Sequence, residues 1–403
     1  MSEWLTASEA AERLGIQLPT LYAYVSRGLL VSHPIPGVHR GSRYRKADID
    51  RLAGRSRGRA AAGAFTVVVD SALTLVEPAG RLYYRGWDVP TATREASFER
   101  VAEWLWTGIE AHEPPAWCAT PGSLAAVGAA TAGLPAAASL VDRMRVGLAV
   151  TAVTDPLRHD RRPEAVALVG RTLISTLADG LPEIGGAGGS SIAARLWGKL
   201  CSRRASPTEL AALNAALVLL ADHDLAASTL AARVAASTWA DPYLCVQAGL
   251  AALGGPLHGA AADRTRSLFD DVLAGCSAEE VVGDRLRDPA GVPGVGHAVY
   301  EGPDPRAAPL LEAIEAASPP AASWQAVKAI AAVIEERELP AVNVDFALAA
   351  LCVCLDLGAG SGEAIFAIAR TAGFLAHAIE EYPHRLRFRP RTAYFGPAPR
   401  SAS

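Results

Sequence analysis

Residues 222–306 contain three histidine segments: Asp222-His223-Asp224, Gly254-Gly255-Pro256-Leu257-His258-Gly259, and Gly294-Val295-Gly296-His297-Ala298, the last followed by Asp304-Pro305-Arg306. They hold three of only nine histidines in the 403 residues. The glycines beside His258 and His297 let a ligand approach the main chain, which a histidine of a hydrophobic core does not require. Each histidine taken alone is equally well interpreted as a buried, hydrogen-bonded ring. Together they indicate a site for chemistry.

A single carboxylate lies in an apolar stretch further along the chain, in Pro340-Ala341-Val342-Asn343-Val344-Asp345-Phe346. Burial would raise the pKa of Asp345 and suit it to act as a general base. The apolar pattern predicts a helix over 343–357, whose dipole would favour the ionised carboxylate and oppose that shift. The sequence therefore leaves the pKa of Asp345 undecided.

Two arginine segments complete the series: Ala369-Arg370-Thr371-Ala372-Gly373-Phe374 and Arg387-Phe388-Arg389-Pro390-Arg391. In their order and separations, the motifs resemble those of citrate synthases, over a span from about Ala72 to Pro397. The resemblance implies a mainly α-helical body over 65–403, in which a small helical subdomain, roughly 255–362, is inserted into a large one.

The pattern of apolar residues also predicts helices. Alanine is the dominant apolar residue and aromatic residues make up only 6% of the chain, a balance that favours closely packed helices. The helices expected from spacing and from Pro and Gly boundaries begin at Phe98 and continue over 123–131, 140–153, 164–177, 208–221, 226–238, 242–253, 320–338, 343–357 and 362–380. Before them, β-branched alternation over 65–70 and 73–76, followed by Glu77-Pro78-Ala79-Gly80, predicts a small hairpin.

The resemblance implies an acyl-CoA condensing enzyme that joins acetyl-CoA or propionyl-CoA to oxaloacetate, giving citrate or 2-methylcitrate, without a cofactor or metal. In it, Asp345 removes the α-proton of the thioester, while His258 donates to the thioester oxygen and His297 to the acceptor's ketone. The residues that it implies for holding the acceptor's carboxylates are His223, Arg306, Arg370 and Arg389. Arg389 corresponds to an arginine that the family supplies from the neighbouring subunit, which implies a homodimer.

Several positions depart from the family pattern, among them Ala347-Leu348-Ala349 after Asp345, where a smaller and more polar segment is often seen. Ala226 and Ala262 stand where family members usually have asparagine, after the first and second histidine segments. Glu301 stands where many members carry a Lys or Arg for the phosphates of CoA, and this reversed charge should weaken CoA binding. The departures predict either an altered acyl or acceptor pocket or a less efficient enzyme.

The N-terminal segment is basic, although the whole chain has a net charge of −4. Residues 1–60 contain ten Lys and Arg against five Asp and Glu, and the remainder 28 against 37. Thr6 and Glu9 predict a capping box at a helix over 7–14, and a second helix should extend from about Pro19 to Arg27. With a third helix over 48–52, the segment 1–52 resembles a winged helix-turn-helix of the MerR and excisionase type. A linker over 53–64 then leads to the body.

In that family the second helix enters the major groove and the wing contacts the DNA backbone. The residues that the resemblance implies for base contact are Thr20, Tyr22, Tyr24 and Arg27, and those for phosphate contact are Arg40, Arg43 and Arg45. An alternative interpretation is a former DNA-binding module that now docks on the body or on another protein.

The cysteine and hydropathy patterns bear on the compartment. Six cysteines without CxxC pairs predict reduced thiols, and no uninterrupted apolar run is long enough to span a membrane. We therefore expect a cytoplasmic protein. Two other functions remain open: a transcriptional regulator whose body senses acyl-CoA or oxaloacetate, and an idle subunit that lends Arg389 to an active partner.

Overall fold

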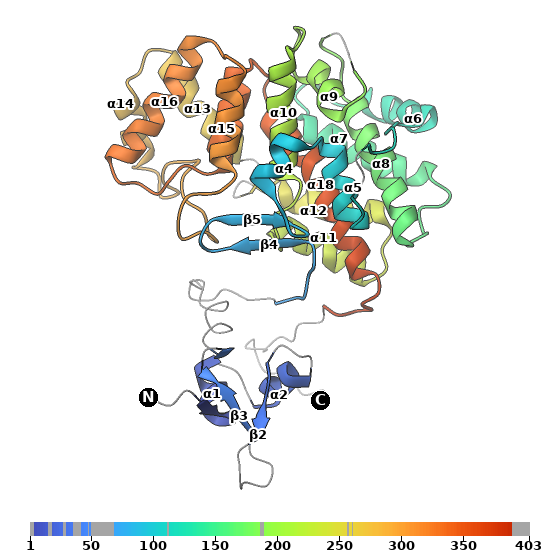
Figure 1. Ribbon diagram of the computed structural model, residues 1–403. Coiled ribbons are helices and arrows are strands. Elements are labelled where there is room, and N and C mark those ends of the chain that lie inside the picture. The colour runs from blue at the N-terminus through green and yellow to red at the C-terminus, as the bar shows by residue number, and fades with distance from the viewer. Residues whose placement is uncertain are drawn as a thin grey trace, which may run out of the picture. The chain divides into compact units, whose positions relative to one another are not determined.

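The computed structural model describes residues 4–14, 18–26, 30–34, 42–46, 48–49, 68–110, 113–185, 189–255, 258–259 and 261–388, without the side chains of residues 19, 20, 23 and 26. The chain divides into two compact units, Met1–Asp70 and Ser71–Ser403 (Figure 1). The subdomain boundaries expected from the sequence stay a prediction.

The first unit contains β1 (Trp4–Thr6), α1 (Ala7–Leu14), α2 (Leu18–Ser26), β2 (His33–Pro34) and β3 (Ser42–Arg45). The strands form an antiparallel sheet in the order β1-β3-β2. The predicted capping box is confirmed, because the Thr6 N–H donates to the Glu9 carboxylate at 2.8 Å and the Glu9 N–H donates to Thr6 Oγ1 at 3.3 Å. Most of the predicted third helix, 48–52, lies outside the described residues.

The second unit opens with a small antiparallel sheet of β4 (Thr74–Glu77), β5 (Arg81–Tyr84) and β6 (Trp87–Asp88). The predicted turn at 77–80 is correct, and Gly80 in it has φ +88°. The predicted strand at 65–70 is wrong in the part that is described, since 68–70 form no strand and β4 pairs instead with β5. Pro78 and Gly80 place the chain reversal after β4, so the partner strand follows it in sequence.

The rest of this unit is helical, and the predicted helices are confirmed to within a few residues at their ends. Several begin at a Ser, Thr or Asp cap, as at Ser206, whose Oγ accepts from the Glu209 N–H at 3.3 Å. The helices are α4 (Val89–Glu95), α5 (Phe98–Thr107), α6 (Pro121–Thr131), α7 (Leu140–Thr154), α8 (Pro163–Asp179), α9 (Ile192–Leu200), α10 (Pro207–Leu220), α11 (Ala227–Ser237), α12 (Pro242–Leu253), α13 (Ala261–Leu273), α14 (Ala278–Arg285), α15 (Ala307–Ala316), α16 (Ala321–Glu336), α17 (Val344–Cys354) and α18 (Ser361–Glu381).

Helix α18 is the centre of the packing. It contacts α5, α7, α8, α10, α11 and α12, and nearly all of its side chains are buried. Small residues allow this close approach. A Cβ on Gly373 would lie 2.4 Å from Asp222 Oδ1, so a glycine is needed where α18 packs on the turn that carries His223.

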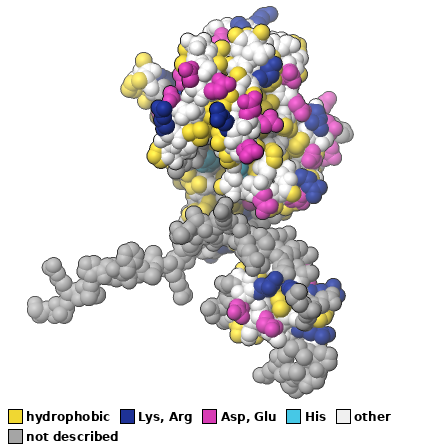
Figure 2. Space-filling model, turned by 90° about the vertical axis from the view of Figure 1, so that its left-hand side faces the viewer, with side chains coloured by type: hydrophobic (Ala, Val, Ile, Leu, Met, Phe, Trp, Pro, Cys, Tyr) yellow, Lys and Arg dark blue, Asp and Glu magenta, His cyan; other side chains and the backbone are white. Residues whose placement is uncertain are grey.

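Helices α13 to α16 lie together on one side of the body (Figure 1), and α17 packs against α13, α15 and α16. The outer face over α14 and α16 carries acidic and basic side chains intermixed, and histidine is visible only in a recess at its lower edge (Figure 2). No described helix is both long and apolar enough to cross a membrane.

Candidate active site

The first histidine lies on a rigid turn between α10 and α11. His223 is only 6% exposed, and its Nε2 lies 2.8 Å from the Tyr300 hydroxyl. The main chain of the turn is held by the Tyr84 hydroxyl, which donates to the Asp222 carbonyl at 2.9 Å. Asp224 has φ +51°, a left-handed conformation that Asp tolerates better than most residues. The turn therefore fixes His223 before any ligand binds.

The third histidine segment is fastened to the stretch before α17. The Gly296 N–H donates to the Ala341 carbonyl at 2.8 Å, and Asn343 Nδ2 donates to the Gly296 carbonyl at 2.8 Å. Gly294 and Gly296 have φ +82° and +70°, which explains why the sequence places glycine there. The Asn343 side chain also caps α17 by accepting from the Asp345 N–H at 2.9 Å. One residue thus connects the His297 loop to the helix start that carries Asp345.

Both ring nitrogens of His297 face donors. The Val299 N–H lies 3.1 Å from Nδ1, a shorter contact than that of Arg306 with Nε2, and it favours a neutral ring with its proton on Nε2. Arg306 Nη2 lies 3.4 Å from that same Nε2. Arginine has only donors, so two N–H groups face the same space. An oxygen atom of a ligand in that space would accept from both.

Arg306 is held in place by Asp304. The Arg306 Nε and Nη2 donate to the two Asp304 carboxylate oxygens at 2.9 and 2.8 Å, and Asp304 Oδ2 also accepts from the Val344 N–H at 3.0 Å. Burial alone would lower the pKa of Arg306, but the nearby Asp304 outweighs it and holds the pKa above its ordinary value. The guanidinium therefore stays charged while it is buried.

His258 and Arg370 meet across one aromatic ring. The His258 and Phe366 ring centroids lie 5.7 Å apart, and the Arg370 guanidinium lies 4.7 Å from the Phe366 centroid. His258 Nε2 is 2.7 Å from Ser228 Oγ. If the serine hydroxyl donates, the ring proton is on Nδ1 and that nitrogen is available to a ligand.

Two of the expected site residues have buried side-chain atoms without a partner, and Asp222 Oδ1, in the turn before His223, is a third such group nearby. Arg370 is 1% exposed and its Nε donates to the Leu220 carbonyl at 2.9 Å, yet its Nη1 and Nη2 have no partner among the described residues. The same holds for Asp345 Oδ1. Buried polar atoms are normally hydrogen-bonded, so these orphans indicate space for a polar ligand.

The electrostatics of the cluster keep the histidines neutral. Burial and the charges of Arg370 and Arg306 lower the pKa of His258 to about 4. Burial and Arg306 likewise lower the pKa of His297 to about 4, and that of His223 falls well below its ordinary value. Burial raises the pKa of Asp345 to about 6, although Arg306 acts in the opposite direction. Near pH 7 the cluster therefore combines neutral histidines that can donate hydrogen bonds, two arginines, and Asp345 in a form that can accept a proton.

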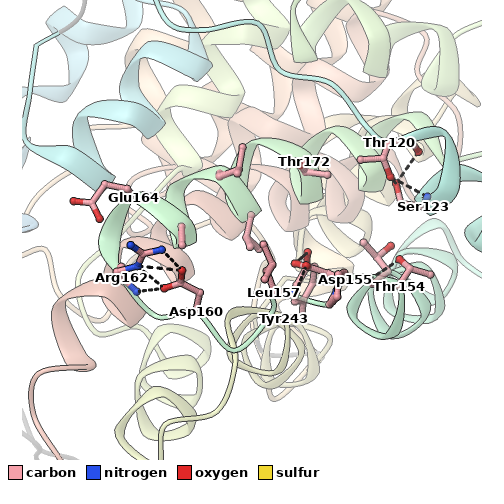
Figure 3. Close-up of a pocket in the computed structure, with 15 residues that line it drawn as sticks. Thr120, Ser123, Thr154, Asp155, Leu157, Asp160, Arg162, Glu164, Thr172 and Tyr243 are labelled. Carbon is pink, nitrogen blue, oxygen red and sulfur yellow. Dashed lines mark hydrogen bonds and ion pairs between the residues drawn. The ribbon is translucent and has the colours of Figure 1, made fainter.

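A separate cavity of about 680 Å³ lies elsewhere, between the ends of α6, α7, α8 and α12. Thr120 and Ser123 line one end and Asp160 and Arg162 the other (Figure 3). None of the expected catalytic residues lines it. Its polar side chains are mostly paired, as where the Tyr243 hydroxyl donates to Asp155 at 2.8 Å. The orphaned atoms of Arg370 and Asp345, together with the histidines grouped near them, mark the candidate active site, and the size of the cavity does not.

The expected site residues are mostly brought together. His223, His297 and Arg306 lie in one group, with the two imidazole centroids 5.0 Å apart. The charges of Arg306 and Arg370 act on both His258 and Asp345. Arg389 lies outside the described residues. Among those described, no group of His, Cys, Asp and Glu could hold a metal ion.

Residues 63–391 match a family model described as citrate synthase, C-terminal domain. The chain belongs to the citrate synthase family. Residues 4–57 match a second model, described as a helix-turn-helix domain. Both recognitions made from the sequence are thereby confirmed.

Named citrate synthases and a methylcitrate synthase are similar to this chain. Citrate synthase 2 of Bacillus subtilis is 36% identical over 196 residues, which are 48% of this chain and 52% of that protein. The 2-methylcitrate synthase of Shewanella oneidensis is 31% identical over 191 residues, 47% of this chain and 51% of that protein. The chain thus spans about half the length of the curated relatives it matches.

A solved structure covers more of the chain. The ternary complex of carboxymethyl coenzyme A and oxaloacetate with citrate synthase from Thermoplasma acidophilum matches with a TM-score of 0.67 and 25% identity, over 84% of this chain and 96% of that chain. The mainly helical citrate synthase fold expected from the sequence is confirmed.

The departures from the family pattern have distinct surroundings. Ala226 is the N-cap residue of α11, and its side chain makes no capping hydrogen bond. Ala262 is 1% exposed, and its Cβ would lie 3.1 Å from a Cβ on Gly362, so a larger side chain would need space that α18 occupies. Glu301 is exposed, and its N–H donates to the Pro78 carbonyl at 3.2 Å, which joins this loop to the β4–β5 turn.

The expected DNA-contacting residues are only partly described. Tyr22 is 53% exposed, as base contact requires, whereas Tyr24 is half-buried and packs against the unit's own core. The Arg43 and Arg45 guanidinium groups lie 4.5 and 5.6 Å from the Trp4 ring centroid. The Thr20 side chain, Arg27 and Arg40 lie outside the described residues.

Proposed function

We propose that the body condenses an acyl-CoA, acetyl-CoA or propionyl-CoA, with oxaloacetate to give citrate or 2-methylcitrate and free CoA. The observation that carries this proposal is the set of buried, unpartnered atoms: Arg370 Nη1 and Nη2 on one side and Asp345 Oδ1 on the other. A dianionic acceptor fits the arginine donors, and the carboxylate is left to act as a base. The oxaloacetate in the Thermoplasma acidophilum complex supports the same acceptor.

The acceptor binds through charge and directed hydrogen bonds. Arg306 and Arg370 pair with its carboxylates, and His223 donates to one of them once Tyr300 gives up its contact at 2.8 Å. The ketone oxygen lies beside His297 Nε2 and Arg306 Nη2, which are 3.4 Å apart, and accepts a hydrogen bond from each. Polarisation of the ketone prepares its carbon for attack.

The acyl donor is activated by Asp345 and His258. The Asp345 carboxylate takes a proton from the carbon next to the thioester carbonyl, and His258 donates to the carbonyl oxygen on which negative charge develops. The resulting enol carbon attacks the ketone carbon, and the ketone oxygen is protonated. Water then hydrolyses the thioester, which releases CoA as a thiol and the product as a carboxylate. This sequence needs no cofactor.

A homodimer completes the site in this proposal, with Arg389 of one subunit reaching the acceptor of the other. Exposed apolar side chains on α7, α8, α12 and the loop between α7 and α8 support a covered surface, because Val153, Leu157, Leu168 and Leu244 are each more than half exposed. We also place the protein in the cytoplasm, since reduced cysteines and acyl-CoA both suit that compartment.

Isotope labelling tests the proposed condensation. The full-length chain is incubated with oxaloacetate and acetyl-CoA that carries ¹³C in both acetyl carbons, and the products are identified by mass spectrometry. Citrate containing both labelled carbons is expected. If no labelled citrate or methylcitrate forms although oxaloacetate binds by calorimetry, condensation is excluded and sensing becomes the leading function.

DNA binding by the N-terminal unit is a second candidate function, favoured by the helix-turn-helix model that matches residues 4–57. The Arg43 and Arg45 side chains beside Trp4 form a basic group suited to phosphate. Replacing Arg43 with alanine should weaken binding to all DNA sequences by a similar factor. It should also reduce the slope of log K against log salt concentration by about one. Equal retention of wild type and R43A on DNA across salt concentrations would contradict this role.

A further inference from the structure

A chain of buried polar side chains leads from the His223 turn through α18 to α11. Asp222, His377, Arg233 and Glu381 are all 0% exposed. His377 Nε2 lies 3.3 Å from Asp222 Oδ2, and Arg233 Nη1 lies 2.9 Å from His377 Nδ1. Arg233 Nε donates to Glu381 at 2.6 Å. The proposed chemistry uses neither His377 nor Arg233.

The partners of His377 define where its proton lies. A guanidinium offers only donors, so the Nδ1 atom facing Arg233 accepts a hydrogen bond and carries no proton. A neutral ring then has its one proton on Nε2, the nitrogen that faces the Asp222 carboxylate. Arg233 is itself held by Glu380 at 2.7 Å and by Glu381. The histidine is thus set as a donor to Asp222.

Asp222 transmits this orientation to His223, its neighbour in sequence. Asp222 Oδ2 also accepts from the Thr74 hydroxyl, and Tyr84 holds the main chain on the other side. Burial would raise the pKa of Asp222, but His377 and then Arg370 outweigh it and hold the carboxylate ionised. Without the donor His377, the buried Asp222 carboxylate at the base of the turn would lack a hydrogen bond. The turn would then shift to compensate.

We propose that His377 is a positioning residue for the acceptor site: its Nε2–H group orients Asp222 and thereby the turn that presents His223, while Arg233 fixes the proton on Nε2. The inference rests on the proposed function, in which His223 binds a carboxylate of the acceptor. His377 does not touch the acceptor itself. A buried stripe on α18 contains Arg370, Gly373, His377 and Glu381. It therefore connects Arg370, which binds the acceptor, with the residues that position the His223 turn.

Two substitutions distinguish the roles of the two ring nitrogens of His377. The amide nitrogen of glutamine can reach the position of Nε2 and donate to Asp222, whereas the shorter asparagine side chain can only accept from Arg233 at the position of Nδ1. Both variants, His377→Gln and His377→Asn, replace the buried ring with a smaller amide. The two variants should therefore lose similar amounts of stability. A difference between their Kd values for oxaloacetate then reports the hydrogen bond to Asp222.

The readout is the Kd of oxaloacetate, measured by calorimetry on the full-length chain, together with the thermal midpoint. H377N should raise the Kd by about tenfold, the equivalent of one lost hydrogen bond, and H377Q by no more than about threefold. In active protein the KM for oxaloacetate should change in the same way with little change in kcat. Equal weakening by both variants, or a larger effect of glutamine, would overturn the proposal.

A second measurement does not depend on the proposed function. In protein labelled with ¹⁵N-histidine, the His377 signals, assigned by their loss in H377Q, should show a proton on Nε2 and none on Nδ1. A proton on Nδ1 would overturn the inference. If wild type does not bind oxaloacetate, the proposed function and the positioning role fail together, and the spectrum still decides the proton assignment.

Discussion

Replacing Asp345 with asparagine should abolish turnover and at the same time stabilise the protein. The change keeps the shape of the side chain and removes its charge. Because a general base contributes about 10²- to 10⁴-fold, kcat should fall by about that factor. Oxaloacetate binding should persist, because Arg306 and Arg370 are unchanged. Thiol release and calorimetry measure the two effects separately.

The stabilisation follows from the raised pKa. Burial raises the pKa of Asp345 to about 6, roughly two units above the ordinary value for Asp, so keeping it ionised in the folded state costs about 3 kcal/mol. The pKa of Asp345 is higher in the folded than in the unfolded state. The residue therefore costs no folding stability below about pH 4, and it lowers the stability as the pH rises through about 6. D345N should therefore melt several degrees higher than wild type at pH 8 and about equally at pH 4.

The pH dependence of activity is the third part of this prediction. Since the base must be ionised, kcat of wild type should fall about tenfold per unit as pH drops below about 6. Asp179→Asn, which changes a carboxylate paired with Arg195 on α8 and α9, is the matched control and should leave kcat unchanged. A D345N rate within threefold of wild type, or a lower melting temperature at pH 8, would refute the reasoning.

Three further predictions concern binding and the division into units. Arg370→Met should weaken oxaloacetate binding by about 100-fold, because the guanidinium has two unpartnered nitrogens before the ligand binds. Unchanged affinity in calorimetry would contradict its role. Glu301→Lys should lower the KM for acyl-CoA by about two- to tenfold with no change for oxaloacetate, and a raised KM would exclude phosphate contact there. Deleting residues 1–60 should leave kcat within about twofold, since the body is a compact unit by itself; loss of activity would show that the first unit supports the body.

The helical body could be predicted because its signals are local. Apolar spacing and proline or serine at helix starts placed most helices to within a few residues, and the glycines of the His297 loop stand where the main chain has positive φ angles. The hairpin was predicted only in part. Its turn is encoded by Pro78 and Gly80, but the choice of partner strand depends on register across the turn, which the residues at 65–70 did not reveal.

The supporting residues of the site could not be predicted in the same way. Tyr300, Ser228 and His377 contact the catalytic cluster or the His223 turn across separations of 77, 30 and 155 residues, and no local pattern marks them. Asn343 carried a signal, because it stands as a cap directly before a helix. Tyr24 illustrates the converse, since the resemblance to helix-turn-helix regulators implied DNA contact for it while its packing is with the unit's own core.

The most direct test of the proposed condensation is release of free thiol by the purified full-length chain. Acetyl-CoA and propionyl-CoA are each supplied with and without oxaloacetate, and D345N is measured beside wild type. The account predicts release that requires oxaloacetate and is lost in D345N, with the ratio of the two rates choosing between citrate and 2-methylcitrate. Release without oxaloacetate, or no release from wild type although both ligands bind, would contradict it.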